Sequence, residues 1–129
     1  MVGLELHLVI HGQPVSWKRG KQMALNPKTR KWFLATGKPQ ARWMKDAIRQ
    51  LKEQWEAEPI PKAVELNAQI ISYLGNRRSI DASNLYQGPE DAMEAAGILE
   101  DDACIRRHDG SDRRYDKLHP RVEITLTLA

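Results

Sequence analysis

Apolar and polar residues alternate with a period of two in three stretches of the chain, over residues 4–10, 64–70 and 122–128. This period places every second side chain on the same face of a β-strand. The sequence therefore predicts three strands, each with one face on a hydrophobic core, and the second of them extends toward Tyr73. A fourth strand is expected at about residues 103–108.

A helical period replaces this alternation between residues 39 and 56. Trp43, Ala47, Leu51 and Trp55 follow one another at intervals of four residues, and lysines and arginines occupy much of the other face. An apolar stripe at this spacing lines one side of an amphipathic helix. We therefore predict a helix whose aromatic stripe belongs to the core.

A second helix is predicted between residues 80 and 105, where Gly97 closes an amphipathic run. Pro89 is expected at its first position, with Glu90 and Asp91 in the first turn, because acidic side chains are favourable at a helix N-terminus. Ser83, which precedes this segment, is a candidate N-cap residue.

The predicted order is strand, basic loop, helix, strand, helix, strand, strand. It indicates an α/β (α+β) two-layer sandwich, in which a mixed four-stranded sheet carries two main helices packed on one face. The last two strands, joined by residues 110–120, are expected to form an antiparallel hairpin. Because no repeat or linker divides the chain, residues 1–129 are expected to form a single domain.

The stretch over residues 16–40 is polar, basic and rich in turn-forming residues. A loop of roughly 25 residues is uncommon in a compact domain and usually indicates function or disorder. Trp17, Trp32 and Phe33 are interspersed among its cations. These aromatic side chains either anchor the loop to the core or stack on nucleic-acid bases.

Positive charge is unevenly distributed, although the net charge is only +3. Between residues 18 and 52 the sole acid is Asp46, among many lysines and arginines, and a second basic group spans residues 106–121. Such blocks are often solvated faces, but here they flank carboxylates, which favours a polyanionic partner. The cations expected to bind nucleic-acid phosphates are Lys18, Arg19, Lys21, Lys28, Arg30, Lys31, Arg77, Arg78, Arg106 and Arg107.

The composition excludes several other kinds of site. A single cysteine, Cys104, excludes an internal disulfide and a zinc site built from thiolates. No window approaches 18 apolar residues, and the N-terminus lacks the basic and apolar regions of a signal peptide. We therefore expect a cytoplasmic protein with no membrane partner.

Two acidic points flank the predicted second helix, with Asp81 before it and the pair Asp101 and Asp102 after it. If this helix connects two strands, the carboxylates can meet at neighbouring strand ends. A few carboxylates, completed by water and substrate phosphate, suit Mg2+. The pattern alone is unspecific, because Asp101 is equally suited to cap a turn and Asp91 to favour a helix N-terminus.

The full pattern across this region is more specific. It resembles the RusA family of Holliday junction resolvases, including phage and prophage members, in the segments Asp81-Ala82-Ser83-Asn84-Leu85, Asp91-Ala92-Met93, Ala96-Gly97-Ile98-Leu99, Asp101-Asp102 and Ile105. Gly12-Gln13-Pro14 followed by Lys18-Arg19 is similar to the opening of the family. The resemblance implies a homodimeric endonuclease that depends on Mg2+, with Mn2+ as an alternative, and nicks branched double-stranded DNA at four-way junctions.

The resemblance assigns roles to individual residues. It implies that Asp81 and Asp102 bind the metal, and that Asp101 and Asp91 complete the catalytic group. Two positions depart from the family pattern, because Ser83 stands where a second catalytic aspartate is usual and Gln87 where a lysine is usual. The first change removes a metal ligand, and the second removes a cation that can neutralise developing phosphate charge.

Three accounts of these departures remain open. Ser83 binds metal through its hydroxyl or a water, or Asp91 and His108 supply the missing ligand, or the protein binds branched DNA without cutting it. His108 would share a strand face with Asp102 if both lay on one extended strand, although a solvated histidine before a turn is also expected. The main hypothesis is a metal-dependent, structure-specific endonuclease that resolves Holliday junctions or related branched DNA. The alternative is a catalytically impaired branched-DNA-binding protein of the same fold, and an RNA- or protein-interaction module is a third hypothesis.

Overall fold

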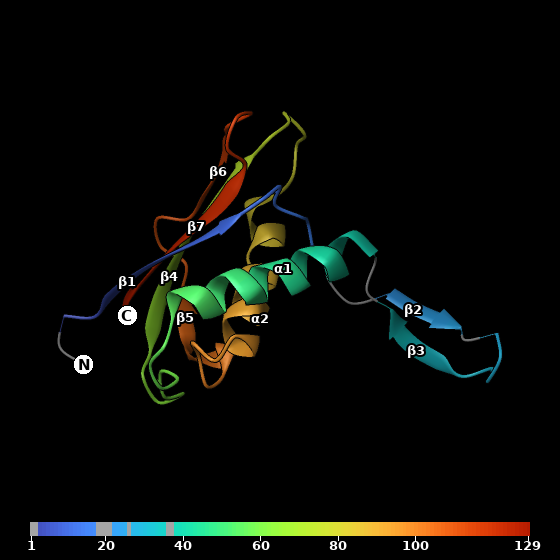
Figure 1. The fold of residues 1–129 in the computed structure, drawn as a ribbon, viewed down its shortest axis with the longest axis horizontal. Helices are drawn as coiled ribbons and strands as arrows, with labels where there is room; N and C mark the ends of the chain where they lie inside the picture. Colours follow the sequence, from blue (N-terminus) through green and yellow to red (C-terminus); the bar gives the residue numbers. More distant parts are fainter. Residues whose placement is uncertain (1–2, 18–21, 26, 36–37) are drawn as a thin grey trace.

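The computed structural model of the chain describes residues 3–17, 22–25, 27–35 and 38–129. Within these residues three strands come before the first α-helix, one strand lies between the two α-helices, and three strands follow the second (Figure 1). Their bounds are β1 (Glu5–His11), β2 (Gln22–Leu25), β3 (Trp32–Ala35), α1 (Lys38–Gln54), β4 (Leu66–Leu74), the 3₁₀-helix η1 (Ala82–Leu85), α2 (Gln87–Ala95), the 3₁₀-helix η2 (Asp102–Cys104), β5 (Ile105–Arg107), β6 (Asp112–Tyr115) and β7 (Arg121–Leu128).

The main sheet is mixed and has five strands in the described part of the chain, in the order β1-β7-β4-β5, with β6 also paired to β4. Strand β7 is antiparallel to both of its neighbours. Strands β5 and β6 are parallel to β4 and pair with successive parts of the same edge. The predicted α+β class and mixed sheet are confirmed, but two short strands share the position expected for one.

The predicted hairpin of the last two strands is wrong, because β7 lies between β1 and β4. Its alternating apolar residues Val122, Ile124 and Leu126 are all buried, so this strand suits a central position with both edges hydrogen-bonded. Strand β5 instead carries the exposed Arg106 and Arg107, and charged residues suit the edge of a sheet.

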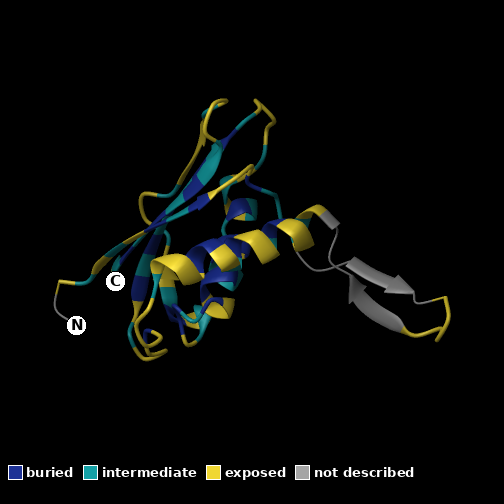
Figure 2. Ribbon diagram, viewed as in Figure 1, coloured by how far each residue is buried: buried dark blue, intermediate teal, exposed yellow. Residues whose placement is uncertain are grey.

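Both helices cover one face of the main sheet (Figure 1). Figure 2 shows the dark-blue buried positions between the helices and the strands. The residues of β4 alternate between buried and half-buried along its whole length, and α1 buries Trp43, Ala47 and Leu51 against the sheet. The predicted strand faces and the aromatic stripe of the first helix are therefore confirmed.

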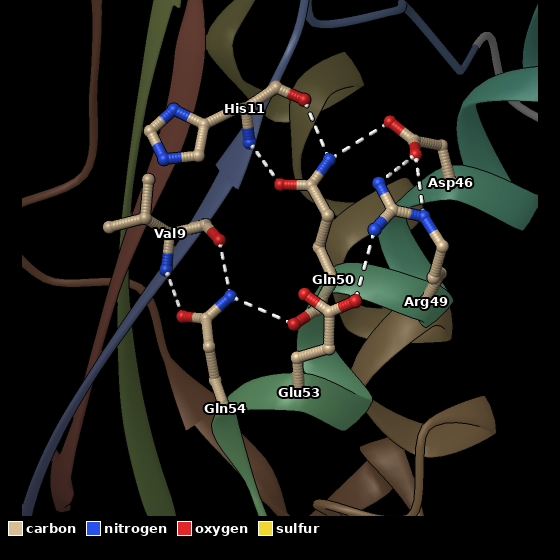
Figure 3. A network of polar contacts seen from close by, with 7 residues as sticks. All are labelled: Val9, His11, Asp46, Arg49, Gln50, Glu53 and Gln54. Carbon is tan, nitrogen blue, oxygen red and sulfur yellow. Dashed lines mark hydrogen bonds and ion pairs between the residues drawn. The ribbon is translucent and has the colours of Figure 1, made fainter.

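The outer edge of β1 is paired to side chains of α1 (Figure 3). The Gln54 amide accepts from Val9 N–H at 2.9 Å and donates to Val9 O at 2.7 Å. Gln50 repeats the arrangement with His11, at 2.7 Å and 2.9 Å. Because i and i+4 side chains lie on one face of a helix, these two amides occupy backbone groups that an edge strand otherwise exposes.

The predicted long loop contains a second, two-stranded sheet formed by β2 and β3, which extends away from the main sheet in Figure 1. Antiparallel pairing from Gln22↔Ala35 to Leu25↔Trp32 defines this hairpin, called here the arm. The prediction of a loop over residues 16–40 did not take into account that aromatic and aliphatic residues on both sides of a turn favour strands. Lys28, Arg30 and Lys31 are exposed at its tip, whereas Lys18, Arg19 and Lys21 lie outside the described residues.

Candidate active site

One short helical segment, η1, precedes the acidic residues of α2. Helix α2 begins at Gln87, so Pro89 is its third residue rather than its first, and a proline is still tolerated there because the first four N–H groups of a helix have no partner within it. Ser83 lies inside η1 and is not an N-cap. Asp81 occupies that capping position instead, without a capping hydrogen bond from its side chain.

The predicted strand at 103–108 begins later than expected, because η2 replaces its first part. Asp101 caps η2, and its carboxylate accepts from Ala103 N–H at 2.8 Å. Aspartate favours this position because its oxygen satisfies an unpaired N–H at the helix start. Asp102 therefore lies on a 3₁₀ turn and does not share a strand face with His108.

A group of carboxylates lies where α2 meets η2. Ligand oxygens of Glu94, Asp101 and Asp102 all lie within 4.8 Å of one another. Glu94 Oε1 also accepts from the Asp102 N–H at 3.1 Å, and this bond holds η2 against the last turn of α2. With Glu90 and Asp91 from α2, these residues form what we call the acidic cluster.

The pKa of Asp102 reflects this crowding. Burial raises the pKa of the Asp102 carboxyl, and the neighbouring Asp91 and Asp101 carboxyl groups raise it further. Like charges placed close together disfavour the ionised form. Asp91 is thus within interaction range of Asp102, as the predicted catalytic group requires. A divalent cation would relieve the same repulsion, so the donor set fits such an ion.

His108 approaches the acidic cluster through Glu90. Its Nε2 is in close contact with Glu90 Oε1, and its ring stacks on Tyr86 with centroids 4.7 Å apart and planes 11° from parallel. Burial raises the pKa of Glu90, His108 opposes the shift, and Asp102 and Asp91 add to it. His108 therefore lies beside Glu90, whereas the strand spacing predicts Asp102 as its neighbour.

Asp81 lies in different surroundings. It is exposed, its backbone carbonyl accepts from Asn84 N–H at 3.0 Å, and it lines a cleft together with Arg78 and Asn84. Within the described residues it is not part of the group formed by Glu94, Asp101 and Asp102. That Asp81 and Asp102 bind one ion therefore stays a prediction.

The predicted phosphate-binding cations have varied surroundings. Arg106 pairs with Glu65 at 2.8 Å, and Arg107 lies 4.0 Å from Asp109. The Arg77 guanidinium lies over the Tyr115 ring at 4.2 Å, and Arg78 lines the cleft beside Asp81. Exposed ion pairs contribute little to stability, so Arg106 and Arg107 can exchange their carboxylate partners for a phosphate at low cost.

Two members of the acidic cluster were not predicted as site residues. The sequence pattern places Glu90 only at the helix start and indicates no role for Glu94. The two residues are four apart on α2, so they project from the same side of the helix. That spacing, read together with Asp91, was the available signal.

These features define a class of protein, namely a small α+β domain with a cluster of carboxylates where its second helix meets a 3₁₀ turn. The family of endodeoxyribonuclease RusA matches residues 9–127, nearly the whole chain. The chain therefore belongs to the RusA endodeoxyribonuclease family, whose members resolve Holliday junctions. No curated protein sequence gives a significant match.

In the part of the chain that the structure describes, no helix is both long and apolar enough to cross a membrane.

Proposed function

We propose that this protein is an active, divalent-metal-dependent endonuclease that resolves four-way DNA junctions by paired nicks. The observation that carries the proposal is the acidic cluster, in which Glu94, Asp101 and Asp102 bring ligand oxygens within 4.8 Å of one another. Membership of the RusA family supports branched DNA as the substrate. Mg2+ is the proposed ion, because it prefers carboxylate oxygens and retains waters and substrate phosphate as further ligands.

Asp102 and Glu94 are the proposed principal ligands, with Asp101 and Asp91 beside them and Asp81 proposed to reach the same phosphate from the cleft that it lines. When bound, the ion would polarise the scissile phosphate and activate a water. Glu90, held against His108, limits the freedom of the first turns of α2 and so fixes the direction of Asp91.

The departure at Ser83 has a proposed remedy in the same cluster. Ser83 is exposed on η1 and supplies no carboxylate, whereas Glu94 adds one beside Asp102. This supports the account in which another side chain replaces the missing ligand, with Glu94 in that role rather than His108. The loss of a lysine at Gln87 is compensated, in this proposal, by Arg78, which lines the cleft with Asp81, and by Arg113, which donates to the Ile80 carbonyl.

Asp102→Asn is expected to abolish Mg2+-dependent nicking of a labelled four-way junction while junction binding is retained. Glu94→Gln should lower the rate by about 10-fold or more, as expected when a ligand of a catalytic ion is lost. The matched control is Glu58→Gln, an exposed acid outside the cluster. Cleavage by Asp102→Asn at the rate of the unmodified protein would contradict the assignment.

A binding protein without nuclease activity is the competing proposal, and Ser83 is the observation that favours it. Titration with Mg2+ and then Mn2+ on the same junction separates the two. Product at any metal concentration supports the nuclease. Binding without product, together with restored cutting in Ser83→Asp, supports the impaired protein.

A homodimer is also proposed, because two symmetric nicks across a junction require two active sites related by a two-fold axis. Sedimentation velocity of the free protein, and of its complex with a junction, measures the number of chains. One chain per junction at saturation would contradict the paired-nick proposal.

A further inference from the structure

The cleft beside Asp81 is built from three segments that are distant in sequence. Its volume is about 580 Å3, within the range of roughly 300–1,000 Å3 that is usual for small-ligand sites. The segment after β1, the first turn of α1 and the connection from β4 into η1 form its walls. The residues that determine its chemistry are Pro14, Pro39, Gln40, Arg78, Asp81 and Asn84.

Hydrogen bonds between these segments hold the walls in place. Gln40 Nε2 donates to Ser16 O at 3.3 Å, which joins α1 to the segment after β1. Gly75 N–H donates to Gln13 Oε1 at 2.8 Å, which joins the end of β4 to the same segment. Trp17 N–H donates to Asn84 O at 2.7 Å and adds η1. The cleft therefore exists before any ligand enters it.

The lining combines three kinds of group. The Arg78 guanidinium and the Asn84 side-chain amide make no hydrogen bond to another described residue. Gln40 uses its N–H group, which leaves its amide oxygen as an acceptor. Two proline rings, Pro14 and Pro39, give apolar surface between these polar groups.

This combination matches the parts of a nucleotide. Asparagine and glutamine amides carry a donor and an acceptor side by side, as the edge of a nucleobase does. A guanidinium binds phosphate through two parallel hydrogen bonds. A site for a bare anion would need neither the amides nor the prolines.

We propose that the cleft binds one unpaired deoxynucleotide of the substrate, with its base among the side-chain amides and proline rings and its phosphate at Arg78. The inference rests on the proposed function, since branched DNA supplies such a nucleotide. A base at a branch point leaves the stack at lower cost than one inside a duplex. Insertion of this nucleotide places the adjoining phosphate beside Asp81, so the cleft selects branch points over continuous duplex.

The first experiment uses a four-way junction carrying 2-aminopurine at each branch-point position in turn, with metal removed by EDTA. The fluorescence of one position should rise by about twofold or more when the protein binds, because the base loses its stacking neighbours. Ser79→Leu, which places a larger side chain in the cleft wall, should lose most of that rise. Ala63→Leu makes the same kind of change at an exposed turn and should retain it.

Unchanged fluorescence at every branch-point position in a saturated complex of the unmodified protein overturns the proposal. An equal rise in Ser79→Leu overturns it as well. Fluorescence anisotropy of an end-labelled junction measures binding separately. Each variant is compared at a protein concentration that saturates the junction, and a variant that does not bind is recognised by this measurement.

A second experiment separates this proposal from the proposed function. If the protein binds no four-way junction, the proposed function fails, and the cleft is tested alone with each of the four deoxynucleoside monophosphates in turn. Shifts of the Gln40 and Asn84 side-chain amide signals in a 15N–1H spectrum, absent with inorganic phosphate, support a nucleotide site. No shift at these amides overturns it.

Discussion

The indole ring of Trp17 lies so close to Gly88 that the first turn of α2 has no room for a side chain at this position. A Cβ placed on Gly88 would lie 2.2 Å from Trp17 Nε1 and 2.8 Å from its Cδ1. Trp17 packs against the hydrophobic core, so the ring cannot move away freely. The segment that leads from β1 toward the arm is therefore fixed to the helix that carries Glu90, Asp91 and Glu94.

Gly88→Ala is expected to lower the free energy of unfolding by about 1–3 kcal/mol, the usual cost of adding volume to a packed contact. Alanine favours helix more than glycine by roughly 1 kcal/mol, which offsets part of that loss. Urea unfolding followed by circular dichroism measures the difference, with Gln87→Ala as an exposed control on the same turn. The same penalty in a Trp17→Leu background would show that the tryptophan is not its cause.

Gln50→Ala should destabilise the protein more than Gln54→Ala, although both amides make the same pair of bonds to β1. Gln50 is buried, so water cannot fully replace its amide as the hydrogen-bond partner of the His11 N–H and C=O groups. The expected cost is about 1–3 kcal/mol. Gln54 is exposed, and water can take its place at Val9. Urea unfolding of both variants and of Glu53→Ala tests the order, and a larger loss for Gln54→Ala would contradict it.

Asp102→Asn should be more stable than the unmodified protein at neutral pH in the absence of metal. Burial and the neighbouring Asp91 and Asp101 carboxyls raise the pKa of Asp102 in the folded state, so its ionised form opposes folding. This penalty is present above the raised pKa and disappears as the pH falls below the ordinary value for aspartate. Thermal unfolding from pH 7 to pH 3 should therefore show the two proteins converge on acidification.

Addition of Mg2+ should reverse that order. An ion that binds only the folded state adds about 2.7 kcal/mol at 100 times its dissociation constant, and the same carboxylates that repel one another would then share a positive charge. The unmodified protein should gain thermal stability with Mg2+ and lose it when EDTA is added. Glu58→Gln should respond in the same way and Asp102→Asn should not, and equal responses of all three would contradict a site at Asp102.

The sequence predicted elements well where one face of the element is buried. The alternation in β1, β4 and β7 and the stripe from Trp43 in α1 follow directly from burial, which acts on each residue locally. Strand order depends on pairing between distant segments, and alternation alone does not distinguish a central from an edge strand. The position of β7 between β1 and β4 was missed for that reason.

The candidate site was predicted in part for a related reason. Asp91, Asp101 and Asp102 meet because η2 turns back on α2, and the hydrogen bond from Asp102 N–H to Glu94 closes that turn. The prediction of a continuous strand hid this turn and with it the part played by Glu94. Trp17 is confirmed as an anchor to the core, whereas the side chains of Trp32 and Phe33 lie outside the described positions.

The edge of β4 opposite β7 pairs with two short strands, β5 and β6, rather than with one long strand. Between them the Asn67 amide bonds to the backbone of Asp109 in both directions, at 2.8 Å and 3.2 Å, and Ser111 Oγ accepts from Ile70 N–H at 2.9 Å. This edge of the sheet therefore presents no long, continuous row of free backbone N–H and C=O groups with which another chain could pair. Fibril-like stacking through this edge of the main sheet is therefore disfavoured.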